Sequence, residues 1–250
     1  MTAPAVFELR NASKQYDAHT TALQNVSLTV ATGARLAIVG GSGSGKTTLL
    51  NTLLGIVTLS SGECLFRGAA INPARAHTLK RLRAETGVIF QDPGSGFNPF
   101  LPLRKSLLEP AKNQRNRDQK LAQLLAQMHL PADAPERFPH EFSGGQRQRL
   151  AAVRALITDP AIVIADEPVS ALDVLARQQF ISAISSAVSS RKITFITVTH
   201  DLAIVPLLAD TMAVLKDGEI VEQGEVERVL RDPQHPYTTA LTRAAGGILG

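Results

Sequence analysis

The amino-terminal part of the chain alternates apolar and polar residues in two neighbouring stretches, VFELRNASKQY and ALQNVSLTVATG. Successive side chains of a β-strand point to opposite faces, so a period of two is typical of a strand with one buried face. We therefore expect a pair of half-exposed strands here, forming an antiparallel β subdomain.

Later parts of the chain contain short continuous apolar runs, which are typical of strands buried on both faces. These runs are RLAIVG (35–40), TGVIFQD (86–92), AIVIADEP (161–168) and KITFITVTHD (192–201), and EIVEQG closes the series. The stretch KTTLLNTLLGI after the first run is predicted to be a helix. Buried strands that alternate with helices predict an α/β fold with a mostly parallel sheet and helices on both faces.

Between residues 93 and 160 the pattern becomes helical. The apolar residues of this region recur at the spacing of one helix face, at Leu121, Leu124, Leu125 and Met128. Three prolines then interrupt the chain before a further predicted helix, which follows Ser143. We interpret this region as a mainly helical insertion into the α/β core.

The sequence GGSGSGKTT (40–48) matches the pattern GxxxxGK[ST] between a predicted buried strand and a predicted helix. Its glycines let backbone N–H groups face inward around a polyphosphate, and Lys46 neutralises the β- and γ-phosphates. The Thr47 hydroxyl is a hard oxygen ligand suited to Mg²⁺. A flexible glycine turn is the alternative, but the flanking strand and helix favour a nucleotide site. Its predicted contacts are Gly40, Ser42, Gly43, Ser44, Gly45, Lys46, Thr47 and Thr48.

Two acids, Asp166 and Glu167, end the apolar run IVIADE. An acid at the tip of a strand beside a phosphate loop can hold Mg²⁺ through its water shell. The next carboxylate can orient and polarise an attacking water. Two surface acids that merely end a strand are the alternative, and the phosphate loop upstream favours the catalytic interpretation.

The stretch EFSGGQRQRL (141–150) predicts a second anion site. Ser143 is suited to cap the following helix, and unpaired N–H groups and the helix dipole attract anions at such a start. The chain therefore carries two candidate phosphate-binding sequences, and these residues alone leave open which phosphate the second one serves.

Composition and charge restrict the classes of partner. A formal net charge of +4 suits an anionic ligand but is too small to indicate nucleic acid. The single cysteine, Cys64, is expected to be a buried or half-buried reduced thiol. No signal-peptide pattern is evident, and the apolar stretch LAIVPLLA (202–209) is far shorter than the roughly 20 residues that span a bilayer. We expect a cytoplasmic protein that reaches a membrane only through a partner.

The phosphate loop, SGGQ and DEP occur in the order found in the ATP-binding subunits of ABC transporters, and the chain resembles that family over residues 6–245. The resemblance implies a P-loop NTPase core of the RecA-like type at about 1–92 and 160–225. It also implies a helical signature subdomain at about 93–159 and a helical tail at about 226–250. ATP and Mg²⁺ are the implied cofactors, and ATP hydrolysis is the implied activity.

The same resemblance assigns roles to further residues. Tyr16, before the first hairpin, matches the aromatic that stacks on adenine, although a strand aromatic in the core is the alternative. Gln91 matches the Q-loop glutamine, which touches Mg²⁺ and links the site to the membrane subunit. His200 matches the switch histidine that contacts the γ-phosphate. Asp173 ends SALD (170–173), which matches the loop that crosses the dimer interface.

In this family the signature sequence serves the nucleotide of a second ATPase subunit, identical or paralogous, that pairs head to tail with the first. The residues implied to contact the nucleotide held by Lys46 of the other chain are Ser143, Gly144, Gly145 and Gln146. Hydrolysis then loosens the dimer. Phe142 stands where leucine is commoner and Val169 where threonine is commoner, and neither change affects a catalytic role.

Two stretches, FQDPGSGFNPFLPLRKSL and DPQHPYTTALTRA (232–244), are similar to those of dipeptide, oligopeptide and nickel importer ATPases. The implied function is to power an importer of peptides, nickel or metal chelates at the cytoplasmic face of the membrane. Transmembrane permease subunits are the implied direct partners, and a solute-binding protein is an indirect one. The sequence end and the lack of further cysteines favour a short nickel, metal-chelate or dipeptide member over a long oligopeptide one.

Other members of the family are less similar. A long coiled-coil insertion, a second ATPase domain and fused membrane spans are missing from the sequence, which disfavours chromosome-type, translation-factor and exporter members. An accessory ATPase of phosphonate breakdown remains an alternative. A Pro-capped terminal helix that only packs on the core is compatible with both functions.

Overall fold

The computed structural model describes residues 3–17, 19–74 and 76–246. The chain forms two compact units. The first unit comprises Met1–Ala84 and Thr194–Gly250, and the second comprises Glu85–Ile193. The second unit is therefore an insertion into the sequence of the first.

An antiparallel sheet opens the first unit, as the alternating pattern predicted. Its strands are β1 (Ala5–Asp17), β2 (Thr20–Ala31), β4 (Ser61–Phe66) and β5 (Ala69–Ala70), in the order β2-β1-β4-β5. Phe7, Leu9 and Val26 are buried, whereas Arg10 and Asn25 are exposed. The predicted strand pair is confirmed. The strands β4 and β5 also belong to this sheet, and the alternating pattern does not predict them.

The first unit also contains a mixed sheet built around β3. Its strands are β3 (Arg35–Val39), β8 (Thr194–Thr199), β9 (Thr211–Lys216) and β10 (Glu219–Glu225). The strand β3 pairs in parallel with both β8 and β9, and β10 pairs antiparallel with β9. The prediction that EIVEQG closes a series of buried strands is wrong, because most residues of β10 are half-exposed or exposed at the sheet edge.

Short helices complete the first unit. They are α1 (Lys46–Leu53), α2 (Ala76–Glu85), the 3₁₀ turn Leu202–Ile204, α7 (Val205–Leu208), α8 (Val226–Arg231) and α9 (Pro236–Ala244). One core cluster joins β3 and β9 to α7 and α8, with Tyr237 and Leu241 of α9 packed against it. No helix among the residues described here has the length and apolar character needed to cross a membrane.

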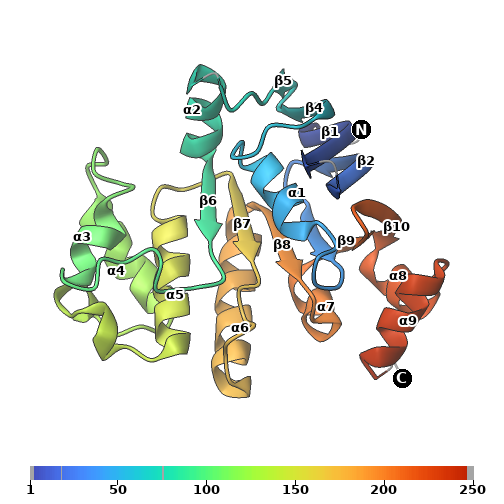
Figure 1. Cartoon of the computed structure of the whole chain (residues 1–250). Coiled ribbons are helices and arrows are strands. Elements are labelled where there is room, and N and C mark those ends of the chain that lie inside the picture. Colours follow the sequence, from blue (N-terminus) through green and yellow to red (C-terminus); the bar gives the residue numbers. More distant parts are fainter. Residues whose placement is uncertain (1–2, 18, 75, 247–250) are drawn as a thin grey trace. The chain divides into compact units, whose positions relative to one another are not determined.

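The second unit combines a parallel strand pair with helices. Its elements are β6 (Thr86–Ile89), α3 (Leu103–Leu108), α4 (Arg117–Gln127), 3₁₀ turns at Ala134–Glu136 and Pro139–Glu141, α5 (Gly144–Leu156), β7 (Ile162–Asp166) and α6 (Val174–Arg191). Figure 1 shows α3, α4 and α5 gathered beside β6. The strand β6 ends at Ile89, before the predicted end at residue 92, and Phe90 beyond it is 44% exposed.

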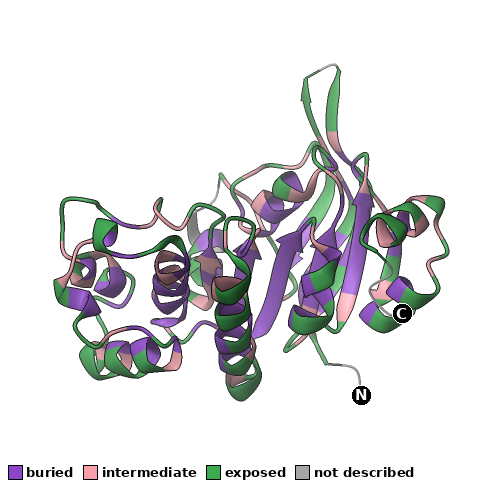
Figure 2. Cartoon of the chain, turned by 90° about the horizontal axis from the view of Figure 1, so that it is seen from below, coloured by how far each residue is buried: buried purple, intermediate pink, exposed green. Residues whose placement is uncertain are grey.

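The burial of α4 and β7 follows the predicted patterns. Leu121, Leu124 and Leu125 form the buried face of α4, and Ile162 to Ala165 are fully buried in β7. Figure 2 shows this contrast between strands that are buried along their length and helices with one buried and one exposed face. The predicted fold class, α/β with mainly parallel strand pairs and an antiparallel sheet near the amino terminus, is confirmed.

Candidate nucleotide site

The loop between β3 and α1 has the backbone that a phosphate cradle requires. Gly43 and Gly45 have φ values of 76° and 102°, in the left-handed region that favours glycine. A Cβ on Gly45 would lie 2.2 Å from the carbonyl oxygen of Ala22, and one on Gly40 would lie 2.2 Å from that of Leu215. Neither position has room for a side chain, so the loop curls tightly against its neighbours.

The side chains of this loop are placed to meet an anion. The Nζ of Lys46 donates to the carbonyl oxygens of Gly40 and Gly41, at 2.8 and 2.7 Å. The buried Oγ of Ser44 has no hydrogen-bond partner within the described part of the chain. Thr47, in the first turn of α1, is exposed. A buried hydroxyl without a partner is costly, so this cradle fits a polyphosphate that supplies the missing hydrogen bond.

His200 leaves the same end of the sheet as the phosphate loop. In the parallel β3–β8 pair, Val39 lies opposite Thr199, and the loop and His200 follow directly. His200 is exposed, and the N–H of the next residue, Asp201, donates to the Thr199 hydroxyl. Ligands of open α/β sheets bind at the carboxyl ends of parallel strands, which is where this histidine lies.

Tyr16 lies near the same helix. It is the penultimate residue of β1, within the hairpin rather than before it. Its hydroxyl is 3.4 Å from that of Thr48 in α1. The residue is 54% exposed, and the Nζ of Lys14 lies 5.0 Å from the ring centroid. The alternative of a core strand aromatic is therefore wrong, because the ring is accessible for stacking.

The second unit brings the predicted acids and Gln91 to one edge. Ile89 pairs with Ala165 at the end of the parallel β6–β7 pair, so Gln91 and Asp166 leave the same end of the two strands. Glu167 has a φ of 45°, an uncommon conformation for a residue with a side chain. Its carbonyl oxygen accepts hydrogen bonds from the N–H and Oγ of Ser170, which hold this turn.

The signature sequence begins α5 with a reciprocal cap. The Oγ of Ser143 accepts from the N–H of Gln146 at 3.3 Å, and the Oε1 of Gln146 accepts from the N–H of Ser143 at 2.9 Å. Ser143 and Gly144 are both exposed, whereas Gly145 is buried. The predicted helix start is therefore observed, and the exposed glycine Gly144 directly follows the cap residue Ser143.

Buried contacts hold the signature helix in place. The side chain of Gln148 donates to the carbonyl oxygen of Phe90 at 3.3 Å, beside Gln91. The guanidinium of Arg149, which is 7% exposed, donates to the carbonyl oxygens of Met128 and His129. The signature helix thus has hydrogen bonds both to the segment that carries Gln91 and to the end of α4.

Asp173 caps the neighbouring helix. Its Oδ1 accepts from the N–H of Ala176 at 2.8 Å, at the start of α6. A Cβ built on Gly145 would lie 2.6 Å from the Cβ of that same Ala176. The first turns of α5 and α6 are therefore packed together, and the caps Ser143 and Asp173 are both exposed.

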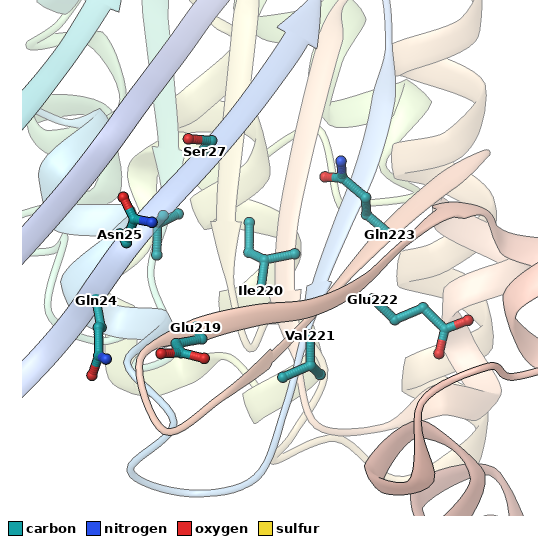
Figure 3. Close-up of a pocket in the computed structure, with 9 residues that line it drawn as sticks. Gln24, Asn25, Ser27, Glu219, Ile220, Val221, Glu222 and Gln223 are labelled. Carbon is teal, nitrogen blue, oxygen red and sulfur yellow. The ribbon is translucent and has the colours of Figure 1, made fainter.

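A pocket elsewhere in the first unit is formed by other residues. It has a volume of about 480 Å³ and lies between residues 24–27 of β2 and residues 219–223 of β10 (Figure 3). Its lining, among the residues described, includes none of the predicted nucleotide residues. We assign the nucleotide to the phosphate loop because the glycine backbone, the Lys46 amine and the buried Ser44 hydroxyl lie there.

The fold and the strand-end residues define a phosphate-loop nucleotide-binding protein. A family model described as "ABC transporter" matches residues 23–170. The oligopeptide transport ATP-binding protein OppF of Streptococcus mutans is 38% identical over 229 residues, covering 89% of this chain and 74% of that protein. A Brucella ovis protein provisionally named as a peptide import ATP-binding protein is 36% identical over 252 residues, covering 98% and 80%.

Solved structures agree with these relatives. CbiO1 of Clostridium perfringens, described as part of the ABC transporter complex cbiONQ, has a TM-score of 0.83 and 27% identity, and the match covers 92% of each chain. A dimeric ATP-binding cassette, MJ0796, bound to ADP and phosphate, has a TM-score of 0.78 and 28% identity, covering 88% of this chain and 98% of that one. The chain belongs to the ABC transporter family. It binds ATP and is an ATPase whose hydrolysis is coupled to transport.

Tyr237 contacts the phosphate loop, and the sequence does not predict this contact. Its hydroxyl accepts a hydrogen bond from the N–H of Gly41 at 2.8 Å. The sequence predicted only a Pro-capped terminal helix, and Pro236 does begin α9. The proline marked the helix, but no local pattern pointed from that helix to a glycine loop near the other end of the chain.

Proposed function

We propose that this chain is the ATP-hydrolysing subunit of an ABC importer for peptides. The observation that carries the proposal is its 38% identity to an oligopeptide transport ATP-binding protein, over 89% of its length. The complete series of strand-end and helix-cap residues described above supports an active ATPase. Nickel and metal chelates are narrower alternatives for the solute.

Nucleotide binding rests on the first unit in this proposal. The N–H groups and side chains from Gly40 to Thr48 hold the phosphates, with Lys46 leaving its carbonyl partners to meet the β- and γ-phosphates. The exposed ring of Tyr16 stacks on adenine. His200, at the strand end beside the loop, contacts the γ-phosphate.

Hydrolysis adds the strand-end residues of the second unit. Glu167 orients the attacking water and takes its proton. The exposed hydroxyl of Thr47 and the oxygens of Asp166 and Gln91 are hard ligands of the kind Mg²⁺ prefers, and these three residues would hold it. The ion would neutralise charge that develops on the phosphate oxygens.

The signature residues serve the nucleotide of a second ATPase subunit, identical or paralogous, in a head-to-tail pair. Ser143 and Gly144 are exposed at the start of a helix of 13 residues, so the helix start is open to a phosphate from outside the chain. Gly145 supports this start by packing against α6, and Gln146 completes the cap. Asp173 begins the neighbouring helix and faces the same interface.

Transmembrane permease subunits are the proposed direct partners, at the cytoplasmic face of the membrane, and a solute-binding protein acts with them. The test is uptake of a labelled oligopeptide in cells that lack the gene, complemented with wild-type protein or with Glu167→Gln. We expect uptake with wild type alone, and co-purification of the wild-type chain with a membrane protein. Normal peptide uptake without the gene, or purification of the chain only with phosphonate-processing enzymes, would reject the importer.

A further inference from the structure

A hydrogen bond joins the phosphate loop to the carboxyl-terminal segment. The N–H of Gly41 donates to the hydroxyl of Tyr237, with 2.8 Å between nitrogen and oxygen. Gly41 follows the first glycine of the loop, and Tyr237 lies in the first turn of α9. The two residues are 196 positions apart in the sequence, so this contact exists only in the folded chain.

The other end of Gly41 holds the phosphate-binding lysine. Its carbonyl oxygen accepts from the Nζ of Lys46 at 2.7 Å. One residue therefore receives Lys46 on its carbonyl side and is fixed by Tyr237 on its N–H side. A Cβ on Gly41 would lie 3.1 Å from the Tyr237 oxygen, so the tyrosine hydroxyl also fills the space beside the loop.

Tyr237 is itself fixed from several directions. Its N–H donates to the Nδ1 of His235, which caps α9, and its ring packs against the core cluster of β3 and β9. The Nζ of Lys216, at the end of β9, lies 5.3 Å from the ring centroid. A rigid ring presents its hydroxyl at a fixed position, which is what a hydrogen bond that positions a loop requires.

Glu222 anchors the segment that leads to Tyr237. The Glu222 side chain is only 5% exposed, and its carboxylate accepts from the N–H groups of Gln234 and His235, both at 3.0 Å. Arg228 lies 3.7 Å from one of its oxygens. Figure 3 shows Glu222 pointing away from Gln24 and Asn25. Glu222 is one of the residues that line the pocket between β2 and β10, but its carboxylate makes its hydrogen bonds to the carboxyl-terminal segment.

We propose that Tyr237 is a positioning residue for ATP binding. Its hydroxyl holds Gly41, Gly41 holds the resting position of Lys46, and Glu222 holds the chain that delivers the tyrosine. Tyr237 acts through the loop and does not touch the nucleotide. This inference rests on ATP binding by the chain and is independent of which solute the importer carries.

The experiment compares equilibrium binding of ATP by wild type, Tyr237→Phe and Thr239→Val, with ATPase kinetics of the same proteins. Phenylalanine keeps the packed ring and removes the hydroxyl. Thr239 lies on the same helix and its hydroxyl donates to the His235 carbonyl at 3.3 Å, so valine removes a hydroxyl that does not reach the loop. For Tyr237→Phe we expect the Kd and KM for ATP to rise about three- to tenfold, which corresponds to the loss of one hydrogen bond.

A role in positioning predicts that kcat of Tyr237→Phe stays within about twofold of wild type, because the catalytic groups remain intact. Thr239→Val should bind ATP as wild type does. Unchanged ATP affinity in Tyr237→Phe, or an equal loss in Thr239→Val, would overturn the proposal.

A second variant tests the anchor and does not depend on the folding of the first. Glu222→Gln weakens the hold on Gln234 and His235 and should raise Kd for ATP in the same direction. Combined with Tyr237→Phe it should add less than about twofold, because both changes act through one contact. Fully additive losses would show that the carboxyl-terminal segment acts by another route. Wild-type ATP binding, measured alongside, separates these outcomes from a failure of the chain to bind ATP at all.

Discussion

Gly145 packs against Ala176 so closely that a Cβ built on the glycine would lie 2.6 Å from the Cβ of the alanine. This contact joins the first turns of α5 and α6, whose exposed caps are Ser143 and Asp173. In the same turn of α5, a Cβ on Gly144 meets no described atom within 4 Å. Gly145 is therefore required by the packing of α5 against α6, whereas the packing of the described residues does not require a glycine at Gly144.

Alanine at each of these glycines separates packing from ligand binding. Gly145→Ala should destabilise the protein by about 1–3 kcal/mol, because overpacking forces α5 and α6 apart. Gly144→Ala should leave the melting temperature unchanged and lower ATPase activity at least tenfold, because its Cβ enters the space proposed for a phosphate. Calorimetry and ATPase assays check both. An active Gly144→Ala protein would contradict the proposed role of the signature.

Replacement of Glu167 by glutamine should keep ATP binding and trap the bound state. The amide has the same shape but cannot take a proton from water, so hydrolysis should fall by at least a hundredfold. Light scattering after gel filtration should then show a dimer that requires ATP. Asp159→Asn is the control, because it alters an exposed acid of the same unit that pairs with Lys120 and Arg191 and not with the catalytic turn. A monomer with saturating ATP would argue against the ATP-closed pair.

The carboxylate of Glu222 predicts a pH-dependent stability. Burial raises its pKa, but the N–H groups of Gln234 and His235 and the charge of Arg228 outweigh burial, so the pKa lies below its ordinary value. A carboxyl with a lowered folded pKa stabilises the protein above its unfolded pKa, about 4.3, and this stabilisation is lost as pH falls through the folded value. At pH 7 the wild-type protein should therefore have a higher melting temperature than Glu222→Gln. The difference should shrink below about pH 4.

Cys64 should resist thiol reagents in the folded protein. Its side chain is 4% exposed on β4, and burial raises its pKa to about 12, so almost no thiolate is present near neutral pH. Labelling with iodoacetamide should occur only after denaturation. Rapid labelling of the native protein would show that β4 opens readily.

Several elements could be predicted because a local pattern specifies them. The alternation in β1 and β2 and the apolar run in β3 depend only on neighbouring residues, and the structure follows both. By contrast, β4 exposes its first three residues and buries its last three, a pattern with no period of two. The strand β9 is also buried on both faces, and its segment TMAVLK contains a short apolar run like that of β3, although it is not among the predicted strands.

The site shows the same division. The conformations of the loop from Gly40 to Thr47 and of the cap at Ser143 depend on residues that are neighbours in the sequence, and so they could be predicted. The alignment of His200 with the phosphate loop depends on the register between Val39 and Thr199, which only the paired strands reveal. The contact between Tyr237 and Gly41 depends on how α9 packs, and a tyrosine in a helix carries no local sign of such a partner.

The central claim is that each nucleotide lies between Lys46 of one chain and Ser143 of another, and mixing two inactive variants tests it. Lys46→Ala removes the phosphate-binding amine. Ser143→Asp keeps a residue that caps helices well but places a negative charge at the phosphate. The double variant mixed with Lys46→Ala serves as the control, because no pairing of these two chains contains an intact Lys46.

Steady-state ATPase activity of the equimolar mixture of Lys46→Ala and Ser143→Asp is the measurement. In a pair of identical chains, random pairing makes half of the dimers mixed, and each mixed dimer has one complete site. The account then predicts recovery to about a quarter of wild-type activity. The control mixture should stay inactive. A mixture of the two single variants with no more activity than the mean of its components would contradict the shared site.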